Sequence, residues 1–272
     1  MKVSIAQTKS IVGDVAGNCE LFAKYAELAA REKSELLIFP ELADTGYELH
    51  SAVKNASPWP GKPTNTLASL AKKHHSWIIS GLTEKTKKGV FNAVAAFSPD
   101  GQLAGHYRKI HLFTGAPVHE ERLLLPGDHP ITLAIDDFKA SILVCYDLRF
   151  PEIWRALAVQ GVDLFLLPSA FPFPRLNHWN TLVQARAIEY QAFLVAANRV
   201  GTDGKITFCG SSRVVDPFGV PTAALGEVDE GLVSCEINKA SVDKVRKSLS
   251  MFRDRRTDVY SLKLLGPKTT RE

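Results

Sequence analysis

An apolar run that ends in a cysteine constrains the fold of this chain more than any other feature. Residues 141–144 (Ser-Ile-Leu-Val) predict a buried strand, and Cys145 closes it. Phe150-Pro151-Glu152 predicts a helix start, because proline suits the first helical turn and an acid suits the positive end of the helix dipole. A thiol between a strand end and a helix start lies where α/β proteins present a nucleophile.

Strands and helices alternate along the chain, which predicts an α/β fold. The motif Ser98-Pro99-Asp100-Gly101 joins two apolar segments and is typical of a hairpin turn. No linker rich in Pro, Gly or Ser separates the halves, so we expect one domain over residues 1–260 with a tail over 261–272. Strands are expected at about 3–7, 36–39, 77–82, 91–97, 102–107, 131–135, 139–144, 163–167 and 192–197, and near 213, 220 and 233. Helices are expected at about 18–33, 67–71, 152–160 and 177–191, so that each of two sheets is covered by helices.

The composition argues against several classes of partner. Of the 272 residues, 45% are hydrophobic and 23% are charged, which is ordinary for a soluble globular protein. The net charge is only +4 and the basic residues are dispersed, so we expect no nucleic-acid partner. No segment resembles a signal peptide or a membrane-spanning helix, so we expect a cytoplasmic protein without a membrane partner. Four cysteines lie far apart without metal spacing, so we expect reduced thiols and no metal: Cys19, Cys145, Cys209 and Cys235.

Two further residues close predicted strands as Cys145 does. Glu41 follows the short strand at 36–39, and Lys109 ends the predicted hairpin. Glu, Lys and Cys in this order, each at a strand end, resemble the nitrilase superfamily of carbon–nitrogen hydrolases, and the resemblance runs from Met1 to about Tyr260. It implies a four-layer α-β-β-α sandwich, no cofactor, and assembly as a homodimer or a higher homo-oligomer.

These three residues can supply what attack on an amide requires. A free thiol has a pKa of about 8.5, so the nucleophile needs a base, and the oxyanion needs a positive charge or hydrogen-bond donors. Cys145 can be the nucleophile, and Glu41 can be the base and later the acid. Lys109 can be the fixed charge that favours first the thiolate and then the oxyanion, and the backbone N–H of Tyr146 can be a second oxyanion donor.

The resemblance also implies a second catalytic glutamate in the loop after the lysine. Glu120 precedes the Pro126-Gly127 turn by the expected interval, whereas Glu121 is one position off. A carboxylate beside Lys109 would keep the ammonium charged and oriented. The sequence alone leaves the choice between the two glutamates open.

The residues after Cys145 indicate a branch of the superfamily. Nitrile-hydrolysing members typically carry Trp-Glu there, whereas residues 145–152 (Cys-Tyr-Asp-Leu-Arg-Phe-Pro-Glu) resemble the omega-amidase and deaminated-glutathione amidase branch. Substrates of that branch are monoamides of short oxo-dicarboxylates, such as 2-oxoglutaramate, or deaminated glutathione. The resemblance therefore implies hydrolysis of a small carboxylate-bearing amide to acid and ammonia through a cysteine thioester.

A guanidinium group suits the carboxylate of such a substrate. Arg149 and Arg175 are the candidates, and Arg175 lies on the loop after a predicted strand, where α/β proteins bind ligands. We expect Tyr146 and His178 to line the same pocket. Arg149 has an alternative role as the partner of a nearby carboxylate such as Asp147.

Other interpretations stay open at this point. Taken alone, Cys145 could be a small buried hydrophobe, Glu41 a helix-start carboxylate and Lys109 a solvated strand end, but their joint occurrence favours catalysis. A Cys–His hydrolase of the papain kind would need one of three histidines, namely His111, His119 and His178. The remaining classes are other small-amide or N-carbamoyl hydrolases, an acyltransferase that uses the same thioester, and an interaction protein without catalysis.

Overall fold

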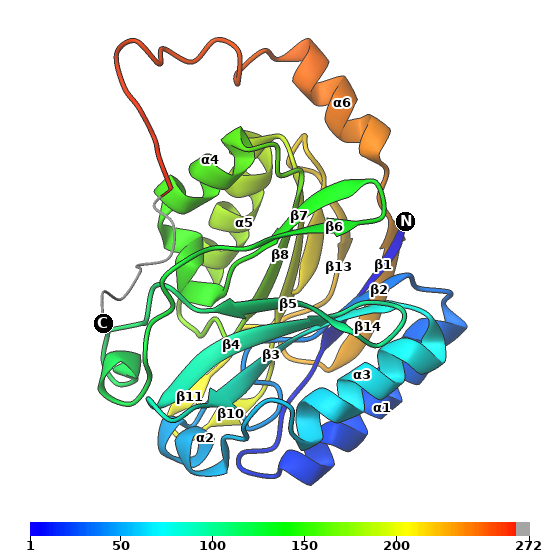
Figure 1. The fold of residues 1–272 in the computed structure, drawn as a ribbon, viewed down its shortest axis with the longest axis vertical. Coiled ribbons are helices and arrows are strands. Elements are labelled where there is room, and N and C mark those ends of the chain that lie inside the picture. Colours follow the sequence, from blue (N-terminus) through cyan, green and yellow to red (C-terminus); the bar gives the residue numbers. More distant parts are fainter. Residues whose placement is uncertain (265–272) are drawn as a thin grey trace.

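Two facing six-stranded β-sheets form the centre of the molecule (Figure 1). A computed structural model describes residues 1–264; the predicted division at residue 260 stays a prediction, because residues 265–272 of the expected tail lie outside the described part. Across the first sheet the order is β14 (Gly231–Glu236), β1 (Lys2–Gln7), β2 (Leu36–Ile38), β3 (Trp77–Lys85), β4 (Val90–Phe97) and β5 (Leu103–Arg108). Across the second it is β13 (Pro221–Ala224), β12 (Arg213–Val215), β9 (Phe193–Asn198), β8 (Leu164–Ser169), β7 (Phe138–Ile142) and β6 (Thr132–Ile135).

Helices cover the outer faces of both sheets (Figure 1). The first sheet carries α1 (Val15–Arg31) and α3 (Lys62–His74), and the second carries α4 (Pro151–Val159) and α5 (Leu176–Tyr190). The layers are therefore α-β-β-α, and the predicted fold class is confirmed. The smaller elements are α2 (Leu49–Asn55), α6 (Lys239–Ser248), the pair β10 (Thr202–Asp203) and β11 (Ile206–Thr207), and two 3₁₀ turns at Glu120–Arg122 and Cys145–Arg149. Within residues 1–264 we find no helix with both the length and the apolar character that crossing a membrane requires.

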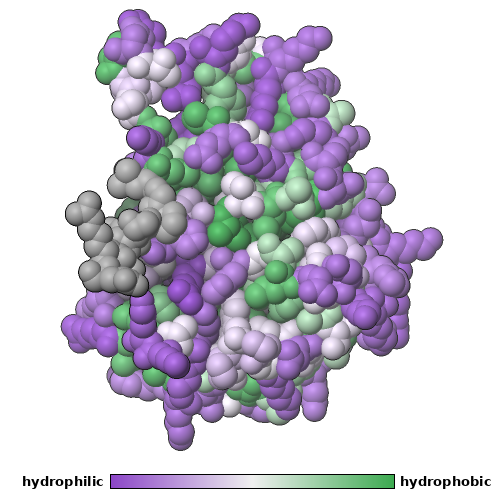
Figure 2. All heavy atoms as spheres, in the orientation of Figure 1, coloured by the Kyte–Doolittle hydropathy of each residue, from purple (hydrophilic) through white to green (hydrophobic). Residues whose placement is uncertain are grey.

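Alternation along the strands divides apolar side chains between two cores. Ile5 of β1 and Ile38 of β2 belong to the core between the sheets, whereas Leu37 packs with Phe22 and Leu67 of the helices. This follows from the two-residue period of a strand, and each such buried side chain stabilises the fold by about 1.5–3 kcal/mol. Consistent with this burial, the face in Figure 2 is mostly hydrophilic, with smaller apolar areas between polar ones.

An aromatic cluster joins the second sheet to its helices. Trp154 of α4 is fully buried, with ring centroids 4.8 Å from Phe165 of β8 and 6.2 Å from Tyr190 of α5. Its indole Nε1 donates a hydrogen bond of 2.8 Å to the carbonyl oxygen of Asp147. The cluster therefore anchors the turn that carries Cys145 as well as filling the core.

Most predicted elements are present, with boundaries shifted by a few residues. The first helix begins at Val15 and not at residue 18, because Asp14 caps it by accepting from the N–H of Gly17. α4 begins at Pro151 as predicted. Helices α2 and α6 were not predicted; α6 buries only Val242 and Val245, so its sequence offers few apolar residues by which to recognise a helix.

A glycine on β3 makes room for the segment that carries Glu41. A Cβ atom at Gly81 would lie 2.5 Å from Glu41 Cα and 2.6 Å from the carbonyl oxygen of Pro40. The N–H of Gly81 donates to that same oxygen at 3.0 Å. Backbone fixes both neighbours, so neither can move away cheaply.

We predict that Gly81→Ala lowers the free energy of unfolding by about 1–3 kcal/mol, because the new methyl group overpacks a fixed backbone contact. Urea unfolding measures the change. Gly226→Ala is the control, since a Cβ there meets nothing within 4 Å; it should change stability by less than about 0.5 kcal/mol. Equal stability of the two variants would show that the segment that carries Glu41 moves to make room for the new methyl group.

Candidate active site

Three strand ends from the two sheets meet at one buried point. Glu41 follows β2, Lys109 directly follows β5, and Cys145 opens the 3₁₀ turn after β7. Lys109 Nζ lies 2.7 Å from Glu41 Oε1, and both side chains are fully buried. The structure thus brings together the groups that the sequence placed 68 residues apart.

Glu120, and not Glu121, lies beside Lys109. The nearest distance between Glu120 and Lys109 Nζ is 2.8 Å, and the Glu120 side chain is fully buried. It also accepts hydrogen bonds from Tyr47 Oη at 2.8 Å and from the N–H of Phe113 at 2.7 Å. Glu121 is exposed and lies 3.0 Å from His119. Of the two glutamates that the sequence left open, Glu120 is therefore the neighbour of Lys109.

Cys145 occupies a backbone conformation that is unusual for its residue type. Its φ is 43°, in the left-handed region, where a residue with a Cβ is strained. Asp147 holds this turn in place by accepting from the N–H of Val144 at 2.8 Å and from Tyr107 Oη at 2.7 Å. His111 Nδ1 lies 2.7 Å from the same carboxylate. Asp147 thus ties the end of β5 to the cysteine turn.

The charges at the site keep Lys109 protonated and Cys145 a thiol. Burial alone would lower the pKa of Lys109, but the carboxylates of Glu120 and Glu41 raise it above its ordinary value. Burial and the carboxylate of Glu41 raise the pKa of Cys145 well above its ordinary value, although Lys109 opposes this. Lys109 thus favours the thiolate, as expected, but burial and the carboxylate of Glu41 outweigh its single positive charge.

Glu41 has one oxygen to spare for proton transfer. Lys109 holds Oε1, whereas Oε2 accepts only the backbone N–H of Ala170, at 2.8 Å, among the hydrogen bonds of the described residues. Burial raises the pKa of Glu41, Lys109 lowers it and Glu120 raises it, with a net rise above the ordinary value. A carboxylate with a raised pKa is a stronger base than a solvated glutamate.

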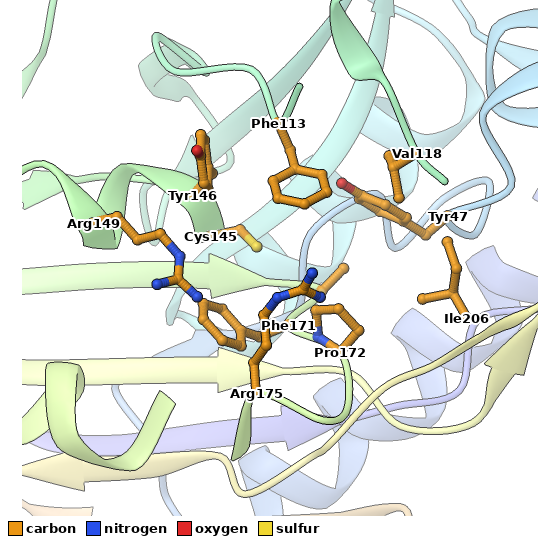
Figure 3. Close-up of a pocket in the computed structure, with 11 residues that line it drawn as sticks. Tyr47, Phe113, Val118, Cys145, Tyr146, Arg149, Phe171, Pro172, Arg175 and Ile206 are labelled. Atoms are coloured by element: carbon orange, nitrogen blue, oxygen red, sulfur yellow. The ribbon is translucent and has the colours of Figure 1, made fainter. Parts of the chain in front are cut away.

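A narrow pocket opens above the thiol (Figure 3). Aromatic and aliphatic side chains form most of it, and Tyr146 lies in its wall. Figure 3 shows the Cys145 sulfur pointing into the middle, with Arg149 on one side and Ile206 on the opposite side. The remaining lining residues include Tyr47, Phe113, Val118, Phe171, Pro172 and Arg175.

Both predicted arginines line this pocket, and no carboxylate of residues 1–264 forms an ion pair with either. The guanidinium carbon of Arg149 lies 5.2 Å from the ring centre of Phe171, and that of Arg175 lies 5.6 Å from the ring centre of Phe113. Asp147 bonds to other groups, so the alternative pairing of Arg149 with Asp147 is absent. Burial and the charge of Arg175 lower the pKa of Arg149. The lack of a carboxylate partner and the closeness of two positive charges both favour an anionic ligand.

None of the three candidate histidines forms a hydrogen bond with Cys145 in the described structure. His178 is exposed and lies outside the pocket lining, where its Nδ1 accepts from Arg149 Nη2 at 3.2 Å. His111 pairs with Asp147 and His119 with Glu121. The arrangement disfavours a Cys–His hydrolase. No group of His, Cys, Asp and Glu within residues 1–264 has the geometry to hold a metal ion.

Two residues at the site were not found from the sequence. Tyr47 lies in a loop and touches Glu120, and Asn92 of β4 touches both glutamates. One signal could have revealed Asn92: it is the only polar residue in the strand 90–97 (Val-Phe-Asn-Ala-Val-Ala-Ala-Phe). A polar side chain in a fully buried strand needs a hydrogen-bond partner.

Comparison with known proteins agrees with this site. The carbon-nitrogen hydrolase family model matches residues 2–247, so the chain belongs to this family and is a carbon–nitrogen hydrolase. It is 35% identical over 241 residues to the 2-oxoglutaramate amidase of Bacillus subtilis, covering 87% of this chain and 92% of that protein.

Two solved structures are similar over nearly the whole chain. XC1258 from Xanthomonas campestris, a CN-hydrolase superfamily protein with an arsenic adduct in its active site, has a TM-score of 0.89 and 29% identity, covering 98% of this chain and 99% of that one. An amidase mutant from Nesterenkonia sp. AN1, with acrylamide added at its active-site cysteine, has a TM-score of 0.82 and 26% identity, covering 95% and 98%. The predicted family and fold are confirmed.

We predict that Glu120→Gln lowers kcat by about 100-fold, because Lys109 loses a fixed counter-charge and its orientation toward the oxyanion. KM should change little, since Glu120 lies outside the pocket lining. Steady-state amide hydrolysis measures both. Glu121→Gln is the adjacent control and should behave as the unchanged protein; a larger effect there would reverse the assignment.

Proposed function

We propose that this protein hydrolyses a small amide that bears a carboxylate, giving acid and ammonia through a thioester on Cys145, as an omega-amidase does. One observation carries the proposal. Arg149 and Arg175 face a pocket whose floor is Cys145, and neither has a carboxylate partner among residues 1–264. Both arginines are half-buried, and a guanidinium without a counter-charge in a pocket favours binding an anion.

In the first step Cys145 attacks the amide carbon. Its proton passes to Glu41 Oε2, the oxygen that Lys109 does not hold. The carbonyl oxygen becomes an oxyanion, which Lys109 and the backbone N–H of Tyr146 stabilise. Because Lys109 stays protonated, its positive charge is in place before the oxyanion forms.

In the second step the tetrahedral intermediate collapses. The C–N bond breaks, Glu41 returns its proton to the leaving nitrogen, and ammonia departs. Glu41 then takes a proton from water, which attacks the thioester, and returns it to the Cys145 sulfur as the acid leaves. One water is consumed and Glu41 ends as it began, so proton and electron counts balance.

The relatives support a charged substrate and leave one close alternative. The similarity to a 2-oxoglutaramate amidase favours a short oxo-dicarboxylate monoamide. Deaminated glutathione, or another small amide or N-carbamoyl compound, would use the same cysteine. An acyltransferase would transfer the same thioester to an amine; this structure gives no observation that favours it.

The cellular setting belongs to the same proposal. The four cysteines are free, which supports a reducing compartment such as the cytoplasm. We propose a homodimer or a higher homo-oligomer, on the strength of the family resemblance, and a small-molecule amide as the ligand. Size-exclusion chromatography with light scattering tests the assembly.

We predict that a substrate trapped on the enzyme adds its acyl mass to the peptide that contains Cys145. Cys145→Ala should abolish turnover and the adduct and keep the fold, because one buried sulfur contributes little to this core. Peptide mass spectrometry after acid quenching measures the adduct. Cys235→Ala is the control and should retain it. An adduct on Cys209 would move the site.

We predict that Arg175→Ala raises KM for 2-oxoglutaramate and reduces its advantage over a neutral amide of equal size by at least about tenfold, because the carboxylate loses its charged donor. The ratio of kcat/KM values measures this. Arg155→Ala is the control, since Arg155 lies over Tyr190, outside the pocket lining. Equal rates for both amides in the unchanged protein, or faster turnover of a nitrile, would contradict the substrate class.

A further inference from the structure

The amide group of Asn92 lies between the two glutamates of the site. Asn92 belongs to β4 and is fully buried. Its Nδ2 donates to Glu41 Oε1 at 2.6 Å and to Glu120 Oε1 at 3.2 Å. Its backbone carbonyl accepts the N–H of Lys109 at 2.8 Å. One residue therefore contacts three members of the site.

The orientation of this amide follows from its neighbours. Ionised carboxylates only accept hydrogen bonds, so the NH₂ group must face Glu41 and Glu120. The opposite orientation would place Oδ1 against a carboxylate oxygen. Asn92 Oδ1 has no hydrogen-bond partner among the described residues, which costs free energy because the atom is buried. Asn92 therefore contributes to the site through its two N–H donors.

We infer that Asn92 is a positioning residue for amide hydrolysis: it fixes Glu41 Oε1 so that Oε2 alone takes and returns the catalytic proton. The inference rests on the proposed function and adds to it a residue that sets the state of the base. Lys109 also holds Oε1, but as a point charge on a flexible stem it does not fix the plane of the carboxylate. The planar amide, hydrogen-bonded to both glutamates, can do so.

A pH effect follows from the groups that face Glu41. These are Lys109, Glu120 and Cys145, with Tyr47 and the Arg199–Asp203 ion pair beyond them. The hydrogen bond from Asn92 lowers the pKa of Glu41, so its loss raises that pKa further. Because the base is active only when ionised, the acid limb of the rate profile moves to higher pH.

The test uses Asn92→Leu, which removes both donors and keeps a similar branched shape. We expect kcat at neutral pH to fall about tenfold or more, KM to change less than about twofold, and the acid limb of kcat to move up by about one pH unit. A merely structural role would change thermal stability without moving the limb. The rate of Cys145 alkylation by iodoacetate, measured against pH, reports the midpoint of the free enzyme without any amide substrate and should move in the same direction.

Two controls separate the contacts of Asn92. Tyr47→Phe removes a hydrogen-bond donor from Glu120 only. The midpoint of its acid limb should therefore equal that of the unchanged protein. Ser80→Ala is on the neighbouring strand β3. It removes a buried hydroxyl whose only hydrogen bond within residues 1–264 is to the carbonyl oxygen of Gly81, and it should alter neither rate nor midpoint. A limb shift in Tyr47→Phe equal to that in Asn92→Leu would overturn the inference.

Asn92→Asp provides a second variant of the same shape if the leucine variant does not fold. It replaces the NH₂ group by an oxygen and should lose most activity at neutral pH; full activity there, or an unmoved limb in Asn92→Leu, overturns the inference. A shifted alkylation profile in Asn92→Leu, together with an unchanged protein that hydrolyses no amide, would support the role of Asn92 and refute the proposed function. The two failures are therefore distinguishable.

Discussion

The ion pairs of Lys109 with Glu41 and Glu120 are the interaction on which the rest of the site depends. All three side chains are fully buried, so each charge has lost its water, and removing one partner would leave an uncompensated charge at a cost of about 3–5 kcal/mol. Glu41 follows β2, Lys109 follows β5 and Glu120 opens a 3₁₀ turn. The sheet and its loops must therefore bring these segments together for the charges to be stable at all.

Asp147 fixes the position of the nucleophile, Cys145. It contacts Tyr107 and His111, at the end of the strand that delivers Lys109, and the N–H of Val144, beside the cysteine. Trp154 bonds to its backbone from the helix layer. Cys145 can hold a left-handed φ because this network constrains its turn from three directions. The hydrogen bonds around Asp147 therefore offset the backbone strain at Cys145.

The sequence predicted what depends on local pattern. Glu41, Lys109 and Cys145 were found because each closes a predicted strand, and Pro151 marked its helix start correctly. Tyr47 and Asn92 were not found, since their partner Glu120 is 73 and 28 residues away and no local rule links them. The rise in the pKa of Cys145 was also not predicted, because it depends on burial and on the carboxylates that surround the thiol in space, which a linear pattern does not record.

The excess negative charge around Lys109 also bears on how a reaction cycle ends. Two carboxylates face one ammonium, so the buried cluster as a whole is anionic. In the proposed reaction the uncharged amide group of the substrate lies next to this cluster. Hydrolysis turns this group into a carboxylic acid, which becomes a carboxylate once it loses its proton, while the two arginines still attract the other end of the molecule. Like charges a few ångströms apart in a poorly solvated space repel strongly. The product is therefore repelled at the end where the C–N bond was broken, so the reaction itself promotes product release.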